Sequence, residues 1–155
     1  MKKSKWIKIL IIVYCLVGTG FYYLQEKIFF RPVPLAPYST YHFSQPFIEK
    51  ELQLDSETSI DIVQFTVPDS LRKGIVLYFH GNRENINHYA EFAINFTRNG
   101  YEVWMPDYPG FGKSSGKLSE KVLYEEALQV YKLARIHYPP DSIIIYGRSL
   151  GSGAS

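Results

Sequence analysis

The stretch Ile143-Ile144-Ile145-Tyr146-Gly147-Arg148-Ser149-Leu150-Gly151-Ser152-Gly153 lies close to the end of the 155-residue sequence. Its first four residues are apolar, and β-branched side chains favour the pleated surface of a strand, so residues 143–146 are predicted to form a buried strand. The pattern then changes to Gly-x-Ser-x-Gly, with only small residues after Leu150. A serine between two glycines directly after a buried strand is typical of a nucleophile elbow.

The elbow has physical requirements that these residue types meet. The turn from strand to helix is so sharp that its central residue, Ser149, is expected to have a strained backbone. Gly147 and Gly151 then lie where neighbouring chain leaves no room for a side chain. The same pattern also fits an ordinary glycine- and serine-rich turn. The strand before it supports the elbow, but the helix expected after it lies where the sequence ends, at Ser155.

Composition narrows the functional classes. The formal net charge is +2 and 46% of the residues are hydrophobic, which suits one globular domain or part of a larger one. A nearly balanced charge predicts no nucleic-acid partner. The sequence has one cysteine, Cys15, so neither an intrachain disulfide nor a cysteine-based metal site is expected.

The N-terminal segment resembles a membrane anchor. Lysines precede an uncharged run from Ile9 to Leu24, and lysines flank the cytoplasmic side of such spans. We therefore expect residues 1–24 to form a cytoplasmic tip and a transmembrane signal anchor, with the rest of the chain across the membrane. The alternative is a secretory signal peptide cleaved after Gly20. Residues 25–40 are predicted to be a stiff linker, because Pro32, Pro34 and Pro37 restrain the backbone.

Residues 41–155 show the periodicities of a mixed α/β domain. Two alternating segments, Glu49 to Leu54 and Ile60 to Val67, predict a hairpin with one solvated face. Further along the chain the patterns predict, in order, a buried strand at 74–79, a helix at 84–98 closed by Gly100, a strand at 101–105, a helix capped by Ser119 and ended by Pro139-Pro140, and the strand at 143–146. The apolar face of the second helix is expected to bury Leu123, Ala127, Val130, Tyr131 and Ala134.

Alternating buried strands and helices imply a parallel sheet, whose ligands bind at the carboxyl ends of the strands. Three loops are expected to meet there: His80 to Arg83, Asp107 to Gly116, and Gly147 to Gly151.

The sequences of these loops, Phe79-His80-Gly81-Asn82, Asp107-Tyr108-Pro109-Gly110-Phe111-Gly112-Lys113-Ser114-Ser115-Gly116 and Gly147-Arg148-Ser149-Leu150-Gly151-Ser152-Gly153, resemble the N-terminal half of an α/β-hydrolase. The closest resemblance is to membrane-anchored serine hydrolases related to the Bem46-like and serine aminopeptidase S33-type proteins. The resemblance covers about Glu49 to Ser155. It implies a Ser-Asp-His triad, hydrolysis of an ester, thioester or amide, and no metal or organic cofactor.

The resemblance also assigns roles to residues. Ser149 would be the nucleophile, and the backbone N–H groups of Leu150 and Asn82 would form the oxyanion hole. We expect His80 to be a structural histidine at a strand end, not an acid or base. Asp107 is expected to anchor its loop by accepting hydrogen bonds from backbone amides.

The triad is incomplete in this sequence. In this fold the acid and the histidine follow the serine, but His42, His80, His88 and His137 all precede Ser149. We therefore expect a truncated member of the family, inactive and marginally folded as it stands, with the strand at 143–146 leaving an open apolar edge. The substrate is expected to be an acyl-bearing small molecule or a lipid-like molecule.

Two other functions fit parts of the sequence. Gly112-Lys113-Ser114 after a strand resembles the end of a nucleotide-binding P-loop, but Asp107 stands where that motif needs glycine, and Ser115-Gly116 interrupts the helix it requires. A membrane-tethered binding module without catalytic activity is consistent with the missing base.

Overall fold

The computed structural model describes residues 2–153 of the chain. The predicted segments 1–24 and 41–155 begin or end at Met1 and at residues 154–155, which lie outside the described residues. The chain divides into two compact units, Met1–Arg31 and Pro32–Ser155.

The first unit is a single long helix, α1 (Lys2–Phe29). Within it, Lys5–Leu24 is long and apolar enough to cross a membrane, judged by length and composition. Large apolar side chains along this stretch, such as Trp6, Leu16 and Phe21, are exposed. The helix continues past Leu24, so the segment predicted as a linker at 25–40 begins in helical conformation.

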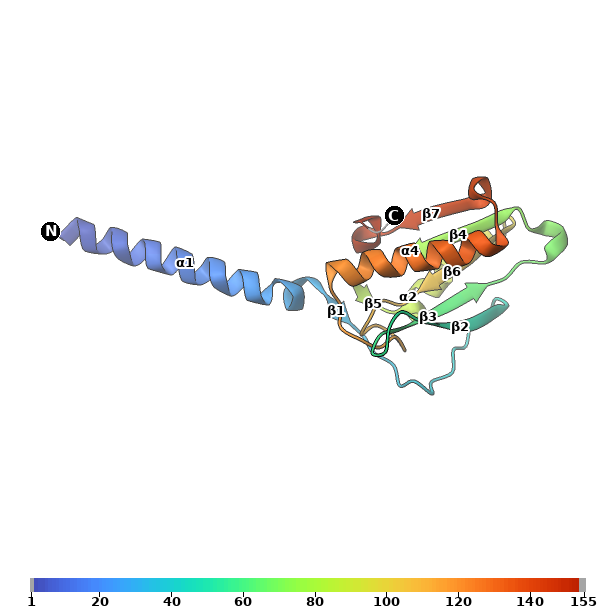
Figure 1. The fold of residues 1–155 in the computed structure, drawn as a ribbon, viewed down its shortest axis with the longest axis horizontal. Coiled ribbons are helices and arrows are strands. Elements are labelled where there is room, and N and C mark those ends of the chain that lie inside the picture. The colour runs from blue at the N-terminus through green and yellow to red at the C-terminus, as the bar shows by residue number, and fades with distance from the viewer. Residues whose placement is uncertain (1, 154–155) are drawn as a thin grey trace. The chain divides into compact units, whose positions relative to one another are not determined.

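The second unit is built on a mixed five-stranded sheet with the strand order β2-β3-β6-β4-β7 (Figure 1). Its strands are β2 (Phe47–Gln53), β3 (Ser59–Phe65), β4 (Gly74–Phe79), β6 (Tyr101–Pro106) and β7 (Ile143–Gly147). The predicted hairpin is confirmed, since β2 pairs antiparallel with β3. The predicted parallel sheet is confirmed too, because β4 pairs in parallel with both β6 and β7. Two-residue strands, β1 (Arg31–Pro32) and β5 (Arg83–Glu84), lie outside this sheet.

One face of the sheet packs against the helical segment after β4. Val76 and Tyr78 of β4 share a buried cluster with Ile86 and Tyr89. The predicted single helix at 84–98 is corrected to three short pieces, α2 (Ile86–Tyr89), a 3-10 turn (Ala90–Ala93) and α3 (Ile94–Thr97). Helix α2 begins at Ile86 because the Asn85 side chain caps it by accepting a hydrogen bond from the Asn87 amide. The predicted left-handed Gly100 is confirmed, with a φ of 88°.

The opposite face is crossed by α4 (Glu120–His137), which lies over β4 and β6 in Figure 1. Its predicted cap is confirmed, because Ser119 Oγ accepts a hydrogen bond from the Val122 amide at 3.3 Å. Four of the five predicted apolar residues are buried, whereas Tyr131 is only half-buried. The fully buried Glu126 was not predicted.

Strand β7 differs from its prediction. Ile144, Ile145 and Tyr146 are 42%, 44% and 40% exposed, so the prediction of a buried strand is wrong for this structure. The reason is that β7 pairs with β4 alone and forms the edge of the sheet within the described residues. The open apolar edge expected from the sequence is therefore present.

The proline-containing segment at the start of the second unit is held by the domain. The Leu35 amide donates to the Gly112 carbonyl at 2.6 Å, and Asn85 Nδ2 donates to the Val33 carbonyl at 2.8 Å. Tyr41 is part of the buried core. The second half of the segment predicted as a linker thus packs along the loop after β6.

Candidate active site

The elbow after β7 has the backbone that its sequence predicts. Ser149 is exposed and has a φ of 54°, in the left-handed region that residues other than glycine rarely adopt. A Cβ on Gly147 would lie 2.3 Å from the Gly151 carbonyl oxygen, and a Cβ on Gly151 would lie 2.1 Å from that of Phe79. Only glycine fits at both positions. A 3-10 turn (Ser149–Gly153) follows the strand directly.

The loop after β4 lies against this elbow. The Arg148 amide donates to the Phe79 carbonyl at 2.9 Å. A Cβ built on Gly81 would lie 3.8 Å from Ser149 Cβ, in van der Waals contact with the serine, and 2.8 Å from the Tyr89 hydroxyl. Asn82, which follows Gly81, and Leu150, which follows Ser149, are both half-buried. Their assignment as oxyanion donors stays a prediction.

His80 is completely buried between aromatic rings. Its ring stacks on Tyr89 with a centroid distance of 5.0 Å and lies 4.5 Å from the Tyr108 ring. Its Nδ1 is 2.8 Å from the Gly81 carbonyl oxygen, which requires Nδ1 to donate the proton. Its Nε2 is 3.0 Å from Asp107 Oδ1, close enough for an ion pair but not aligned as a hydrogen bond. These contacts agree with the expected structural role.

Asp107 ties together the loops after β4 and β6. Its Oδ1 accepts a hydrogen bond from the Ile86 amide at 3.0 Å, as the prediction of a loop-anchoring acceptor requires. A Cβ on Gly112 would lie 1.8 Å from Asp107 Oδ2, so the loop folds tightly over the carboxyl group. Burial raises the pKa of Asp107, and the contact with His80 opposes that rise.

Two further carboxyl groups are buried in the second unit. Asp61 Oδ2 accepts a hydrogen bond from the Tyr41 hydroxyl at 2.7 Å, and burial raises the pKa of Asp61 to about 6. Burial also raises the pKa of Glu126 well above its ordinary value, with the nearby Asp107 charge adding to the effect.

A cationic side chain stands directly beside the serine. The Arg148 guanidinium lies 4.6 Å from the centroid of the Phe92 ring and 5.6 Å from that of Tyr89. Arg148 is exposed at the same edge as Ser149. Sequence reasoning did not single out Arg148 or Glu126. For Arg148, the only signal in the sequence was its position inside the elbow. For Glu126 there was none, because its spacing along the helix is that of the polar residues expected to be exposed.

Two of the other three histidines contact groups away from the elbow, whereas His88 packs on Tyr89 and Phe92, which also contact Arg148. His42 Nε2 is 3.2 Å from the Thr40 hydroxyl, His88 packs on the edge of Tyr89, and His137 lies at the end of α4 near Trp104. That none of them is the catalytic base stays a prediction. No group of three or more potential metal-ligating side chains comes together within residues 2–153.

The nucleotide-binding alternative does not fit the loop after β6. Lys113 Nζ pairs with Glu49 Oε1 at 2.5 Å and lies 4.1 Å from the centroid of the Tyr41 ring. The Ser114 hydroxyl donates to the Asp107 carbonyl. The next helix begins only at Glu120, whereas a P-loop requires a helix beginning at the lysine.

Comparison with known proteins agrees with this geometry. Residues 71–155 match the model of the serine aminopeptidase S33 family, so the match covers more than half of the chain. The chain belongs to this family. It is an S33-type member of the α/β-hydrolase superfamily, and the fold and family predicted from the three loops are confirmed.

Individual relatives match only part of their own length. The chain is 39% identical over 80 residues to alpha/beta hydrolase domain-containing protein 17C of Xenopus tropicalis, a match that covers 50% of this chain and 26% of that protein. The chain therefore spans about a quarter of the length of the curated relatives it matches.

Solved structures show the same fold. An esterase from Pyrococcus furiosus has a TM-score of 0.59 at 22% identity, covering 79% of this chain and 49% of the esterase. The thioesterase domain from the curacin biosynthetic pathway has a TM-score of 0.53 at 24% identity, covering 70% of this chain and 39% of that domain.

Proposed function

We propose that this S33-type chain contributes the nucleophile and the oxyanion hole of a serine hydrolase acting on a carboxylic ester, thioester or amide. The observation that carries the proposal is the left-handed backbone of the exposed Ser149 between two glycines without room for a Cβ. A polar residue held in a strained conformation just beyond the carboxyl end of a strand is a feature of catalytic sites. The proposed role of this strained backbone is to hold the Ser149 hydroxyl away from the sheet.

The proposed reaction begins with attack of Ser149 Oγ on the carbonyl carbon of the substrate. The carbonyl oxygen becomes an oxyanion, for which the N–H groups of Leu150 and Asn82 are the proposed donors. The alcohol, thiol or amine then leaves, and water releases the acyl group from the serine. The position of Gly81 against Ser149 supports this assignment, since it brings the loop that carries Asn82 to the nucleophile.

The serine proton needs an acceptor, and no histidine follows Ser149 in this chain. Without that base a serine hydroxyl is a weak nucleophile. We therefore propose that the 155-residue chain alone turns over an activated ester such as p-nitrophenyl butyrate at close to the background rate. Turnover by the wild-type chain that is abolished in Ser149→Ala would contradict this part of the proposal.

The elbow itself is tested by a thiol in place of the hydroxyl, because a cysteine reacts without a neighbouring base far more readily than a serine. Cys15→Ser first removes the one natural thiol. In that background, Ser149→Cys and the matched control Ser152→Cys are treated with p-nitrophenyl butyrate, and butyrylation is followed by intact mass. We expect the Ser149→Cys variant to acylate at least about tenfold faster than the Ser152→Cys variant, since an oxyanion donor is worth more than that. Equal rates would favour the alternative of a binding module without catalytic activity.

The substrate is proposed to carry an apolar or lipid-like acyl group. Phe92 and Tyr89 lie beneath the Arg148 guanidinium beside the nucleophile, so an apolar surface and a positive charge border the same serine. Acylation of the Ser149→Cys variant by butyryl and acetyl esters of equal reactivity would measure this preference. A faster reaction with the longer acyl chain is expected.

We also propose that α1 anchors the chain in a membrane as a single span, with the N-terminus in the cytoplasm and the hydrolase unit on the opposite side. The apolar stretch Lys5–Leu24 and the lysines around its beginning support this orientation. Cleavage after Gly20, with release of the hydrolase unit, is the alternative. Carbonate washing of membranes should leave the uncleaved chain in the pellet, and a protein in the supernatant would contradict the anchor.

A further inference from the structure

Three adjacent strands carry polar side chains on the face of the sheet that α4 covers. Ile48 of β2 lies opposite Gln64 of β3, and Gln64 lies opposite Trp104 of β6. Residues two apart on a strand point to the same face, so each strand adds a second side chain to this row. The resulting six residues are Ile48, Lys50, Gln64, Thr66, Glu102 and Trp104.

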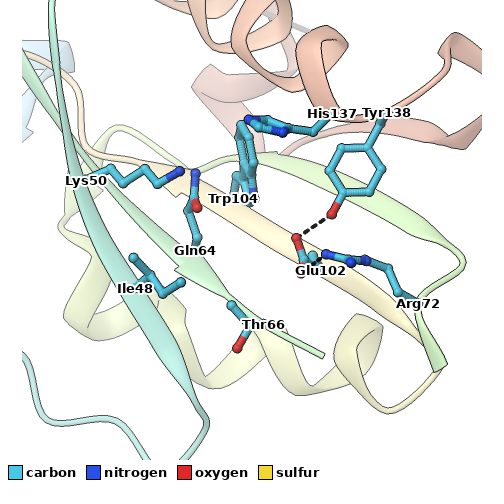
Figure 2. Close-up of a pocket in the computed structure, with 9 residues that line it drawn as sticks. All are labelled: Ile48, Lys50, Gln64, Thr66, Arg72, Glu102, Trp104, His137 and Tyr138. Carbon is cyan, nitrogen blue, oxygen red and sulfur yellow. Dashed lines mark hydrogen bonds and ion pairs between the residues drawn. The ribbon is translucent and has the colours of Figure 1, made fainter. Parts of the chain in front are cut away.

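These side chains line a pocket of about 330 Å³. The remaining wall comes from Arg72, before β4, and from His137 and Tyr138 at the end of α4. Figure 2 shows the Lys50 and Gln64 side chains extending toward Trp104 on one side of the pocket, with Arg72, Glu102 and Tyr138 on the other.

The carboxylate of Glu102, on one side of the pocket, already has partners within the protein. Glu102 Oε1 pairs with Arg72 Nη1 at 3.0 Å, and Glu102 Oε2 accepts a hydrogen bond from the Tyr138 hydroxyl at 2.5 Å (Figure 2). The Lys50 ammonium, 5.8 Å from the centroid of the Trp104 ring, adds a positive charge on the other side. Arg72 also pairs with Asp69, so the positive charge available to a ligand is that of Lys50, which lies beside hydrogen-bond donors of the pocket wall.

Two of those donors are buried without a partner among the described residues. They are Gln64 Nε2 and Trp104 Nε1, and their residues are only 4% and 3% exposed. Burying a donor without an acceptor costs free energy, so such groups in a native protein call for an explanation. A glutamine amide can turn to present its oxygen instead, but an indole N–H can only donate. An acceptor in the pocket satisfies both groups, and a negatively charged one also suits Lys50.

We propose that this pocket binds a small oxyanion, a carboxylate or a phosphate, through Trp104 Nε1, Gln64 Nε2 and the Lys50 ammonium. The site is separate from the elbow. Glu102 is the second residue of β6 and Trp104 the fourth, and β6 is separated from β7 by β4. Ser149 follows the carboxyl end of β7. The pocket thus lies toward the amino ends of the parallel strands, whereas the proposed nucleophile lies beyond their carboxyl ends.

The indole N–H is itself the reporter for the test. The sequence has two tryptophans, Trp6 in α1 and Trp104 in the pocket, so a ¹⁵N-labelled chain in detergent micelles should give two indole signals. Trp104→Phe assigns them. Sodium acetate and inorganic phosphate are titrated separately, with neutral acetamide as the control. We expect a saturable shift of the Trp104 signal with acetate, phosphate or both, and none of the Trp6 signal.

Variants then test the donors. Gln64→Leu removes the amide at similar volume and should weaken binding at least about tenfold, because a hydrogen bond to a charged group is worth that much. Lys50→Gln should weaken it as well, whereas the matched Lys132→Gln, which removes an exposed charge on α4, should not. The proposal is overturned if the Trp104 signal does not move with either anion, if acetamide shifts it equally, or if Lys50→Gln and Lys132→Gln have the same effect.

Discussion

The two ends of the sheet in the second unit are built in different ways. At the carboxyl ends of the parallel strands, backbone packs on backbone, and Gly147 and Gly151 leave no space for even one extra carbon. Toward the amino ends, on the α4 face, side chains from β2, β3 and β6 surround an open pocket. A site made of close backbone contacts holds a nucleophile rigidly. In a site made of side chains, by contrast, residues can be substituted without disturbing the strands.

The carboxyl groups at the two ends also have different environments. Near the loop after β6, Asp61 and Asp107 are carboxyl groups whose pKa values burial raises. In the pocket, Glu102 is paired with Arg72 and Tyr138. The comparison therefore predicts that substitutions at the elbow and its supporting loops change stability strongly, and that substitutions in the pocket change mainly binding.

Gly151→Ala should have the largest effect. The new Cβ would lie 2.1 Å from the Phe79 carbonyl oxygen, which is backbone and cannot turn away. We expect a loss of more than about 3 kcal/mol of unfolding free energy, measured by guanidinium denaturation in detergent. Gly153→Ala is the matched control, since nothing lies within 4 Å of its Cβ position, and it should change stability by less than about 0.5 kcal/mol. Equal losses would show that the elbow is not tightly packed.

Asp61→Asn should change the pH dependence of stability. Folding raises the pKa of Asp61 from 3.8 to about 6, so between these values the folded chain binds more protons than the unfolded chain. Stability is therefore lost as the pH rises through this window. Asparagine removes that loss, and the variant should be more stable than wild type by about 1–3 kcal/mol at about pH 7.5 but not at about pH 3.5.

The check is the denaturation midpoint at the two pH values, with the exposed Asp141→Asn as control. A variant that is less stable than wild type at the higher pH would mean that the charged carboxylate contributes to folding through Tyr41.

Ser149→Gly tests the strain at the nucleophile. Glycine adopts a φ of 54° without the steric cost that serine has, which outweighs its greater freedom in the unfolded chain. We expect a gain of about 1 kcal/mol in unfolding free energy. Ser152→Gly, in the 3-10 turn just beyond, should instead cost about 0.5–1 kcal/mol. Opposite signs in the two thermal melts support a strained elbow, and losses in both would argue against it.

Gln64→Leu should have the smallest effect on folding. It removes a buried amide nitrogen that has no partner among the described residues, so the unfolding free energy of the ligand-free chain should stay equal or rise by up to about 1 kcal/mol. Denaturation without added anions measures it. A loss of more than about 1 kcal/mol would mean that the amide supports the sheet, and the contrast between the two ends would then be weaker.

Local patterns predicted most of the elements, because each depends on residues close together in the chain. The hairpin, the central strands and the Ser119 cap of α4 all agree with the structure. The single helix at 84–98 was wrong because Asn85 caps a later start and Glu84 has a φ of 62°. The exposure of β7 was missed because the burial of a strand depends on how many strands pair with it. The apolar residues of the strand do not specify how many strands pair with it.

The sequence by itself determined the family resemblance and the elbow, because the order Gly-x-Ser-x-Gly after a β-branched run encodes a backbone that few other residue types permit. Only the tertiary structure decided which distant side chains meet. It enclosed His80 with Asp107 and aromatic rings, and it aligned Gln64 with Trp104 through the register of antiparallel strands. The physical reason is that backbone preferences act over a few residues, whereas burial and strand register arise from contacts between segments far apart in the chain.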